Sequence, residues 1–190
     1  MEKIILSKST FIRGLQCAKS LYLYKNKPKL RDAISASQQA IFSRGNTIGT
    51  FAHQLFPGGV DASPSDRFDY AEACSKTNQL MASGMEVIYE ASFQYNGVYC
   101  ALDILVKDKE GWIGYEVKSS SKISATYLMD AALQYEVITK SGVKLSDFQF
   151  IFIDTSYVRK GKIEIEKLFL RKSYLAQIIE RQTLVSSKII

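Results

Sequence analysis

"MEVIYEASFQYNGVYCALDILVKDKEGWIGYEVKSS", residues 85–120, decides the fold, because it contains three runs rich in β-branched and aromatic residues. The pair Asn96-Gly97 separates the first run from the second, and residues 107–111 separate the second from the third. An Asn-Gly pair between such runs is a strong hairpin signal, because both residues accept the positive φ angles of a tight turn. The stretch therefore predicts three consecutive strands that form a meander.

Predicted helices and further predicted strands lie before and after this meander in the sequence. Recurring apolar positions predict helices over residues 7–24, 36–56, 64–83, 125–140 and 174–186. The stretch DFQFIFID, residues 147–154, alternates with period two and predicts a strand, and residues 161–170 predict another strand or a turn followed by a strand. This order predicts an α/β fold with a mixed β-sheet flanked by helices. We expect a single domain, with an N-terminal helical part over residues 1–84 and the core over residues 85–190.

Composition narrows the class of protein. A chain of 190 residues with 46% hydrophobic residues can bury a core, which excludes a disordered chain. We expect neither a membrane helix nor a signal peptide, and three widely spaced cysteines favour the reducing cytoplasm. The net charge of +6 is compatible with a polyanionic partner and equally with a solvated basic surface.

Two carboxylates interrupt the apolar strands of the meander. Glu116 and Lys118 lie on one face of the third strand, since side chains alternate, and Asp103 lies in the second strand one turn earlier. Carboxylates that meet across a hairpin repel each other unless a cation lies between them, and their hard oxygens suit Mg²⁺ or Mn²⁺. The neighbouring Lys118 could orient a water molecule or neutralise charge on a phosphate. The pattern also fits solvated acids and an exposed ion pair, which contributes little to stability.

Several stretches in order carry a resemblance to a known superfamily. Asp103 followed by Glu116-Val117-Lys118 resembles the D…(D/E)xK signature of the PD-(D/E)XK nucleases. The Gln134-Tyr135 pair on the next helix, His53 in RGNTIGTFAHQLF and the N-terminal LSKSTFIRGLQCAKSLYLYK are similar to the RecB-type branch, which includes the CRISPR-adaptation nuclease. The chain resembles most an uncharacterised bacterial family of that branch, along most of its length. This implies a restriction-endonuclease-like core.

The resemblance also implies an activity. The chain would be a metal-dependent nuclease that hydrolyses phosphodiester bonds, with DNA as the expected substrate, and would act as an exonuclease or on single strands. The implied ligands of Mg²⁺ or Mn²⁺ are Asp103, Glu116, the Val117 carbonyl and His53. Lys118 would position the attacking water, and Gln134 or Tyr135 would contact the phosphate or the water. Basic side chains and tyrosines could bind a single strand by charge and stacking, the tyrosines being Tyr22, Tyr24, Tyr95 and Tyr99.

Some assignments stay open at this point. Gln134 and Tyr135 point about 100° apart on a helix, so only one of them can enter the site. Glu90, in the first strand of the meander, is either an additional acid of the site or an ordinary edge-strand residue. A catalytically degenerate module of the same fold that binds nucleic acid or protein is the alternative function, and a regulatory module with solvated acids is another.

Cys17 raises the question of an iron–sulfur cluster. RecB-type nucleases with such a cluster have one cysteine near the N-terminus, which Cys17 matches, and three more after the core. This chain has no cysteine after Gln134, and a [4Fe–4S] cluster needs four thiolates. We therefore expect no iron–sulfur cluster in this chain, either because a longer protein supplies the other ligands or because the cluster has been lost. Alternatively, Cys17 is a small buried helix residue.

Overall fold

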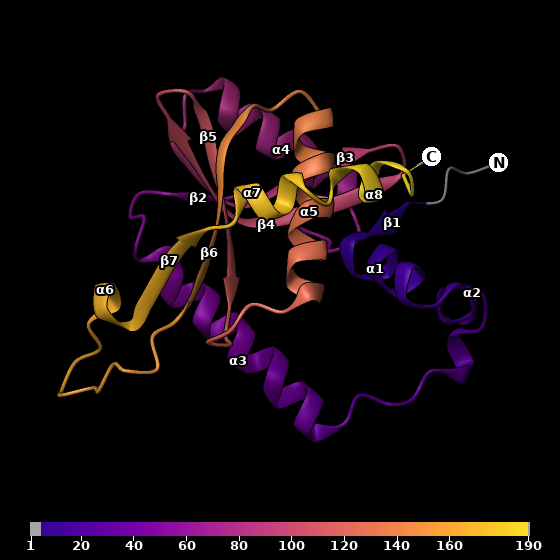
Figure 1. Cartoon of the computed structure of the whole chain (residues 1–190), viewed down its shortest axis with the longest axis horizontal. Helices are drawn as coiled ribbons and strands as arrows, with labels where there is room; N and C mark the ends of the chain where they lie inside the picture. The colour runs from indigo at the N-terminus through magenta and orange to yellow at the C-terminus, as the bar shows by residue number, and fades with distance from the viewer. Residues whose placement is uncertain (1–4, 190) are drawn as a thin grey trace.

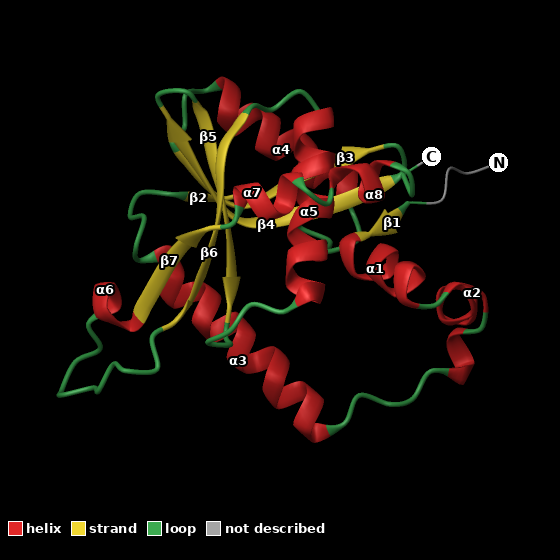
Figure 2. Cartoon of the chain, in the orientation of Figure 1, coloured by secondary structure: helices red, strands yellow, loops and turns green. Residues whose placement is uncertain are grey.

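The computed structural model describes residues 5–189, which form a mixed β-sheet with helices on both faces (Figures 1 and 2). The strands are β1 (Leu6–Ser7), β2 (Val60–Asp61), β3 (Val87–Tyr95), β4 (Val98–Asp108), β5 (Gly111–Lys118), β6 (Leu145–Ile153) and β7 (Phe169–Ser173). The helices are α1 (Lys8–Gln16), α2 (Ala18–Asn26), the 3-10 turn η1 (Pro28–Leu30), α3 (Ala36–His53), α4 (Tyr70–Ala82), α5 (Ala125–Lys140), α6 (Ile165–Leu168), α7 (Leu175–Ile179) and α8 (Gln182–Ser186). The predicted α/β class and the N-terminal helical part are confirmed.

The sheet order among the described strands is β2-β3-β4-β5-β6-β7, and β1 pairs with β4. The predicted meander forms, since β3, β4 and β5 are antiparallel neighbours. The α5 helix connects β5 to β6, which runs parallel to β5, and β7 returns antiparallel to β6. The N-terminal part adds β1 and β2 to this sheet, and both run parallel to their partners.

Two strands, β1 and β5, pair with different parts of the same edge of β4. β3 occupies the other edge of β4 along almost its whole length. On the shared edge, β1 pairs with Val98 and Tyr99, and β5 pairs with residues 104–108. Residues 100–103 have no strand partner there within the described sheet, so β4 is left open between β1 and β5.

Two hydrophobic clusters bury the two faces of the sheet. On one face, α5 packs its buried residues against Phe148 and Phe150 of β6 and against Leu105 of β4. On the other face, Ala52 and Leu55 at the end of α3 pack against a second group, made up of Ile104, Tyr115, Ile151 and Phe169. The helices α5 and α3 therefore lie on opposite faces (Figure 1).

The predicted helix over residues 7–24 is wrong, because the chain breaks at Cys17 into α1 and α2. Cys17 is extended, and its Sγ accepts a hydrogen bond from Ser20 N at the start of α2. The break lets α2 fold back on α1 at Gly14, where a Cβ would lie 2.8 Å from Leu21 Cδ2. Cys17 is exposed, so it is not a buried helix residue. We call residues 8–35 the N-terminal arm, which extends to the right in Figure 2 before a loop returns the chain to α3.

Other element boundaries also differ from the sequence prediction. The helix expected from residue 64 begins at Tyr70, because Asp69 caps it by accepting from Glu72 N at 2.8 Å. The predicted strand over residues 161–170 is mostly a loop and α6, followed by β7. The final helix divides into α7 and α8. No helix within residues 5–189 is long and apolar enough to cross a membrane.

Candidate functional site

Three acidic side chains lie in one row across neighbouring strands. Residues on either side of Glu90 in β3 pair with residues on either side of Asp103 in β4, so Glu90 lies opposite Asp103. The pairing of β4 with β5 ends at Ile104 and Tyr115, and the next residues are Asp103 and Glu116. The two strands part at this step, next to the open edge of β4. We call Glu90, Asp103 and Glu116 the acidic row.

Glu116 is buried and bound on both oxygens. Its Oε1 accepts from Lys118 Nζ at 2.6 Å and from Lys8 Nζ at 2.9 Å, and its Oε2 accepts from Gln134 Nε2 at 2.9 Å. Burial by itself would raise the pKa of Glu116, but the charges of Lys118 and Lys8 outweigh it and lower that pKa to about 2. Glu116 is therefore an anion held by two cations.

Asp103 behaves differently, although it is a neighbour of Glu116. Its Oδ2 accepts a hydrogen bond from Val117 N at 2.6 Å, at the place where β4 and β5 part. Burial raises the pKa of Asp103 to about 8, the charges of Glu116 and Glu90 add to this effect, and Lys8 opposes it. This arrangement, without a cation, therefore favours the protonated form of the Asp103 carboxyl.

Glu90 combines burial with an unusual backbone. Its φ angle is +53°, in the left-handed region that costs free energy for residues other than glycine. Burial raises the pKa of Glu90 to about 7, and the charges of Asp61 and Glu116 contribute. Strained residues of this kind occur mainly at functional sites, which favours the interpretation of Glu90 as an acid of the site over that of an ordinary edge residue.

Two residues of the site were not identified from the sequence. Asp130 of α5 lies 3.4 Å from Lys118 Nζ and 3.5 Å from Lys8 Nζ. It precedes Gln134 by one helical turn, so the two share a face of α5, and this spacing could have identified Asp130. Lys8 reaches Glu116 from a remote part of the chain. No local periodicity connects Lys8 with the acidic row.

The site contains more carboxyl groups than ammonium groups. The acidic row and Asp130 supply four carboxyl groups, and Lys8 and Lys118 supply two ammonium groups. Gln134 Oε1 is buried beside them without a hydrogen-bond partner in the described structure. Carboxyl and amide oxygens of this kind fit a divalent cation in ligand type and in charge. Within residues 5–189, however, no three His, Cys, Asp or Glu side chains are already arranged around one metal position.

The remaining predicted residues lie around this site in different ways. Gln134 enters it, whereas the adjacent Tyr135 packs against the hydrophobic cluster around α5. Val117 contributes its N–H to Asp103. The His53 ring stacks on Tyr89 at 3.9 Å. Burial lowers the pKa of His53, and Asp61 opposes this shift.

The metal-ligand role of His53 stays a prediction. No hydrogen bond or ion pair among the described residues connects its side chain with Asp103 or Glu116. The charge of Asp61 in β2 acts to raise the pKa of His53, and it also raises the pKa of Glu90.

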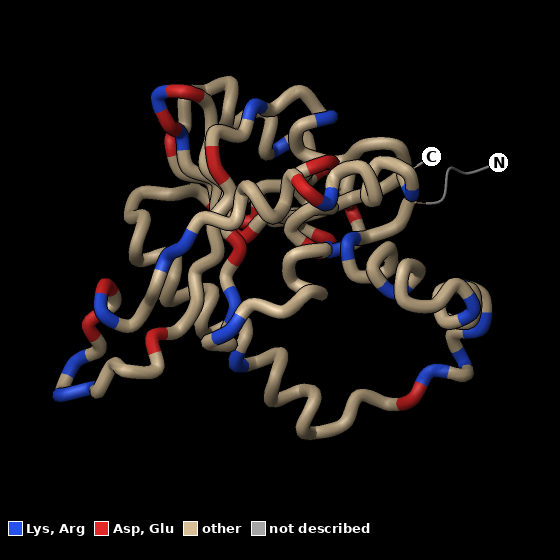
Figure 3. Tube along the Cα trace, viewed as in Figure 1, with Lys and Arg blue, Asp and Glu red and all other residues tan. Residues whose placement is uncertain are grey.

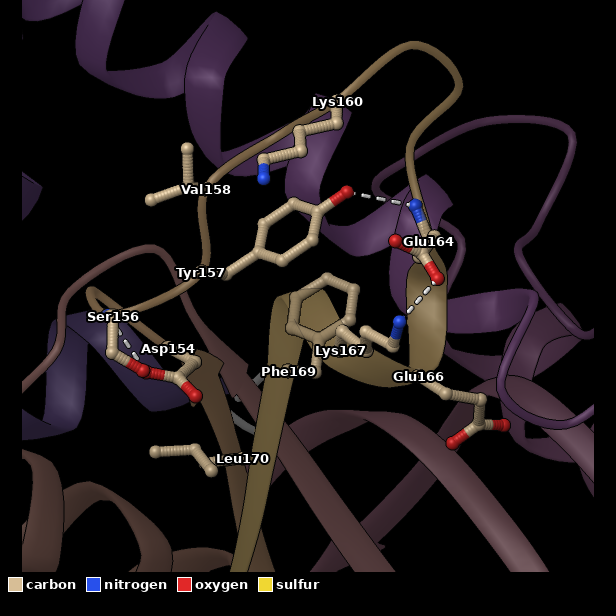
Figure 4. A pocket seen from close by; sticks show the side chains of 10 residues that line it. All are labelled: Asp154, Ser156, Tyr157, Val158, Lys160, Glu164, Glu166, Lys167, Phe169 and Leu170. Atoms are coloured by element: carbon tan, nitrogen blue, oxygen red, sulfur yellow. Dashed lines mark hydrogen bonds and ion pairs between the residues drawn. The ribbon is translucent and has the colours of Figure 1, made fainter.

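Two hollows lie away from the acidic row. One, of about 480 Å³, is formed by the connection between β6 and β7, where Tyr157 Oη accepts from Glu164 N and Lys167 pairs with Glu164 (Figure 4). The other, of about 650 Å³, lies between the N-terminal arm and α3, and many of its lining side chains are basic or apolar. No member of the acidic row lines either hollow.

Comparisons with known proteins leave the family open. No protein-family model matches the chain, and no curated protein sequence matches it. A solved structure described as "Crystal structure of SSO0001" aligns with 97% of this chain and 78% of its own length, with a TM-score of 0.48 and 10% sequence identity. A likeness of this size carries no information on function.

The neighbours Gln134 and Tyr135 provide a matched pair of variants. Gln134→Leu should lower the free energy of unfolding by about 1–3 kcal/mol, because Glu116 Oε2 loses its buried donor. Tyr135→Phe should change it by less than about 0.5 kcal/mol, because the ring that packs against the core is retained. Urea denaturation in a chelator measures both. Equal losses in the two variants would contradict the assignment of Gln134 to the site.

The raised pKa of Asp103 predicts a pH dependence of stability without metal. A folded-state pKa of about 8, against 3.8 for the free group, stabilises the protein fully below 3.8 and loses that contribution as the pH rises through 8. The melting temperature of the chelated protein should therefore fall between roughly pH 5 and pH 8, and by less for Asp103→Asn. Glu116, whose pKa is lowered to about 2, contributes little slope in that window. The same slope in Asp103→Asn would show that Asp103 is not the titrating group.

Proposed function

We propose that the protein is a metal-dependent nuclease that hydrolyses phosphodiester bonds. The observation that carries the proposal is the acidic row beside Lys118, at the point where β4 and β5 part. Carboxyl groups on neighbouring strands with an adjacent lysine are the residue types that hold a divalent cation and act on a phosphate. The resemblance of Asp103 and Glu116-Val117-Lys118 to the PD-(D/E)XK signature agrees with this proposal. DNA is the proposed substrate, cut from an end or as a single strand.

Mg²⁺ or Mn²⁺ is the proposed cofactor. Asp103 and Glu116 would hold the ion, with the carbonyl of Val117, and His53 is a further candidate ligand. The raised pKa values of Asp103 and Glu90 support this, because burial and the neighbouring carboxylates disfavour their ionised forms, and a bound cation would favour those forms. A bound divalent cation supplies positive charge to a phosphate oxygen and lowers the pKa of a water molecule. We propose no iron–sulfur cluster in this chain.

The protein's own residues would orient the reacting groups. Glu116 and Asp130 hold the Lys118 ammonium between them, at 2.6 Å and 3.4 Å, and the Tyr127 ring centroid lies 4.9 Å from it. An ammonium fixed in this way can donate a hydrogen bond to a water molecule or to a phosphate oxygen. Gln134 keeps Oε2 of Glu116 bound, which fixes the orientation of Oε1 toward the lysines.

The N-terminal arm is the proposed contact surface for nucleic acid. Lys and Arg positions, blue in Figure 3, recur along α2 and the segment after it. Tyr24 lies between Arg13 and Arg31, whose guanidinium carbons are 4.6 Å and 3.8 Å from its ring centroid, and Tyr22 is exposed. Basic groups and aromatic faces bind single strands without sequence preference. Tyr95 and Tyr99 are less available, because one packs against the core and the other stacks on Tyr70.

A degenerate module that binds nucleic acid or protein without cutting is the second candidate. The observation in its favour is that three donors already bind the two oxygens of Glu116. Without a cation in the site, the acidic row and the lysines would only stabilise the fold.

Substitutions in the acidic row distinguish the two functions. With Mg²⁺ or Mn²⁺, the wild type should cleave single-stranded DNA. Asp103→Asn and Glu116→Gln should each reduce the rate at least about 100-fold, because each removes an anionic ligand. Lys118→Met should reduce the rate similarly without weakening metal binding. Glu110→Gln, in the exposed turn between β4 and β5, is the control and should cleave like the wild type. Equal cleavage by Asp103→Asn and the wild type would disprove the nuclease site, and binding without cleavage by the wild type would support the second candidate.

A further inference from the structure

Lys8 reaches the acidic row because of its place directly after β1. The short strand β1 runs parallel to β4, with Ser7 opposite Tyr99. The chain at Lys8 therefore continues along β4 toward residues 100–103, where the edge of β4 has no strand partner in the described sheet. The Lys8 side chain enters this opening, and its Nζ lies 2.9 Å from Glu116 Oε1 and 3.5 Å from Asp130 Oδ2.

Two ammonium groups share a single oxygen of Glu116. Lys118 Nζ and Lys8 Nζ both donate to Oε1. Each ammonium group therefore occupies space around this oxygen and weakens the negative potential that would attract another cation. A divalent ion held by the same oxygen would lie within a few ångströms of both ammonium groups. Repulsion between like charges is strong at such distances in a partly buried site. One of the two ammonium groups therefore has to leave when a divalent cation binds.

Lys118 is the better anchored of the two. It ends β5, where it pairs in register with Phe152 of β6, and its ammonium also lies over the Tyr127 ring. Lys8 follows a strand of only two residues. That strand is connected to the hairpin by the bond from Leu6 N to Gly97 O at 2.8 Å. The exposed Lys25 Nζ also donates to Ile5 O, at 3.2 Å. The Lys8 side chain is 22% exposed and has a route to solvent.

We infer that Lys8 is an internal counter-ion that a divalent cation displaces from Glu116, so that occupancy of the site controls how the N-terminal segment is held. This inference rests on the proposed metal site. Without the cation, Lys8 ties β1 and the start of α1 to the acidic row. With the cation bound, the tie is lost, and the α1 helix that it held carries Arg13, which lines the basic hollow beside the N-terminal arm. The site and the proposed contact surface for nucleic acid are thereby coupled.

Calorimetric titration with Mn²⁺ alone tests the displacement. Lys8→Gln and Lys8→Met should bind Mn²⁺ at least about tenfold more tightly than the wild type, because no ammonium has to leave. Lys8→Arg, which keeps the charge, should not gain affinity. Lys109→Gln, in the exposed turn between β4 and β5, makes the same change in net charge away from the site and should bind like the wild type.

Hydrogen exchange supplies a second measurement that does not depend on cleavage. Saturating Mn²⁺ should accelerate exchange of the Leu6 amide, which bonds Gly97 O, in the wild type. In Lys8→Gln that amide should exchange rapidly with or without Mn²⁺. Protection of Leu6 that is unchanged or increased by Mn²⁺ in the wild type would overturn the inference.

The outcomes separate this inference from the proposed function. If the wild type binds Mn²⁺, Asp103→Asn loses it and the uncharged Lys8 variants show no gain, the inference is wrong and the metal site stands. If the uncharged Lys8 variants bind Mn²⁺ more weakly than the wild type, Lys8 supports the site instead of competing with the ion, and the inference is again wrong. If neither the wild type nor the Lys8 variants bind Mn²⁺, both proposals fail.

Discussion

An excess of buried carboxyl groups over ammonium groups, at the point where β4 and β5 part, is the constraint on which the rest of the structure depends. Glu116 is 2% exposed and needs cationic partners, because an isolated buried carboxylate costs several kcal/mol. Lys118 comes from the same strand and Lys8 from the N-terminal segment. The two lysines satisfy Glu116 and Asp130 but leave Asp103 and Glu90 with raised pKa values. A divalent cation in the site would therefore stabilise the ionised forms of Asp103 and Glu90, for which the two lysines do not suffice.

Three parts of the fold bring side chains to this site: the β3–β4–β5 meander, the α5 helix and the N-terminal segment. The β3–β4 hairpin aligns Glu90 with Asp103, and the end of β4–β5 pairing lets the Asp103 side chain replace a backbone carbonyl as acceptor for Val117 N. The crossover helix α5 places Gln134 over Glu116. Because β1 and β5 share one edge of β4, the gap between them admits a side chain from the N-terminal segment. The N-terminal part and the core thus build one site.

Local patterns in the sequence predicted the parts of this arrangement that depend on local physics. The Asn96-Gly97 turn and strand alternation gave the meander, and the two acids interrupting apolar strands marked the site. The partnership of Lys8 with Glu116 was not predictable, because it spans more than half of the chain and leaves no periodic signal. The break at Cys17 was missed because helical periodicity continues through it, whereas the close approach of Leu21 to Gly14 is a tertiary contact that the local pattern does not reveal.

A crystal structure of the wild-type protein grown with Mn²⁺, with anomalous scattering used to locate the ion, tests the central claim most directly. The account predicts one anomalous peak at oxygens of Asp103 and Glu116, at about 2.0–2.2 Å by analogy with the bond lengths of similar small divalent ions. It also predicts that Lys8 Nζ will have moved away from Glu116 Oε1, where it lies at 2.9 Å without the ion. Crystals soaked in excess Mn²⁺ that show no peak there, with Lys8 and Lys118 still bound to Glu116, would contradict it.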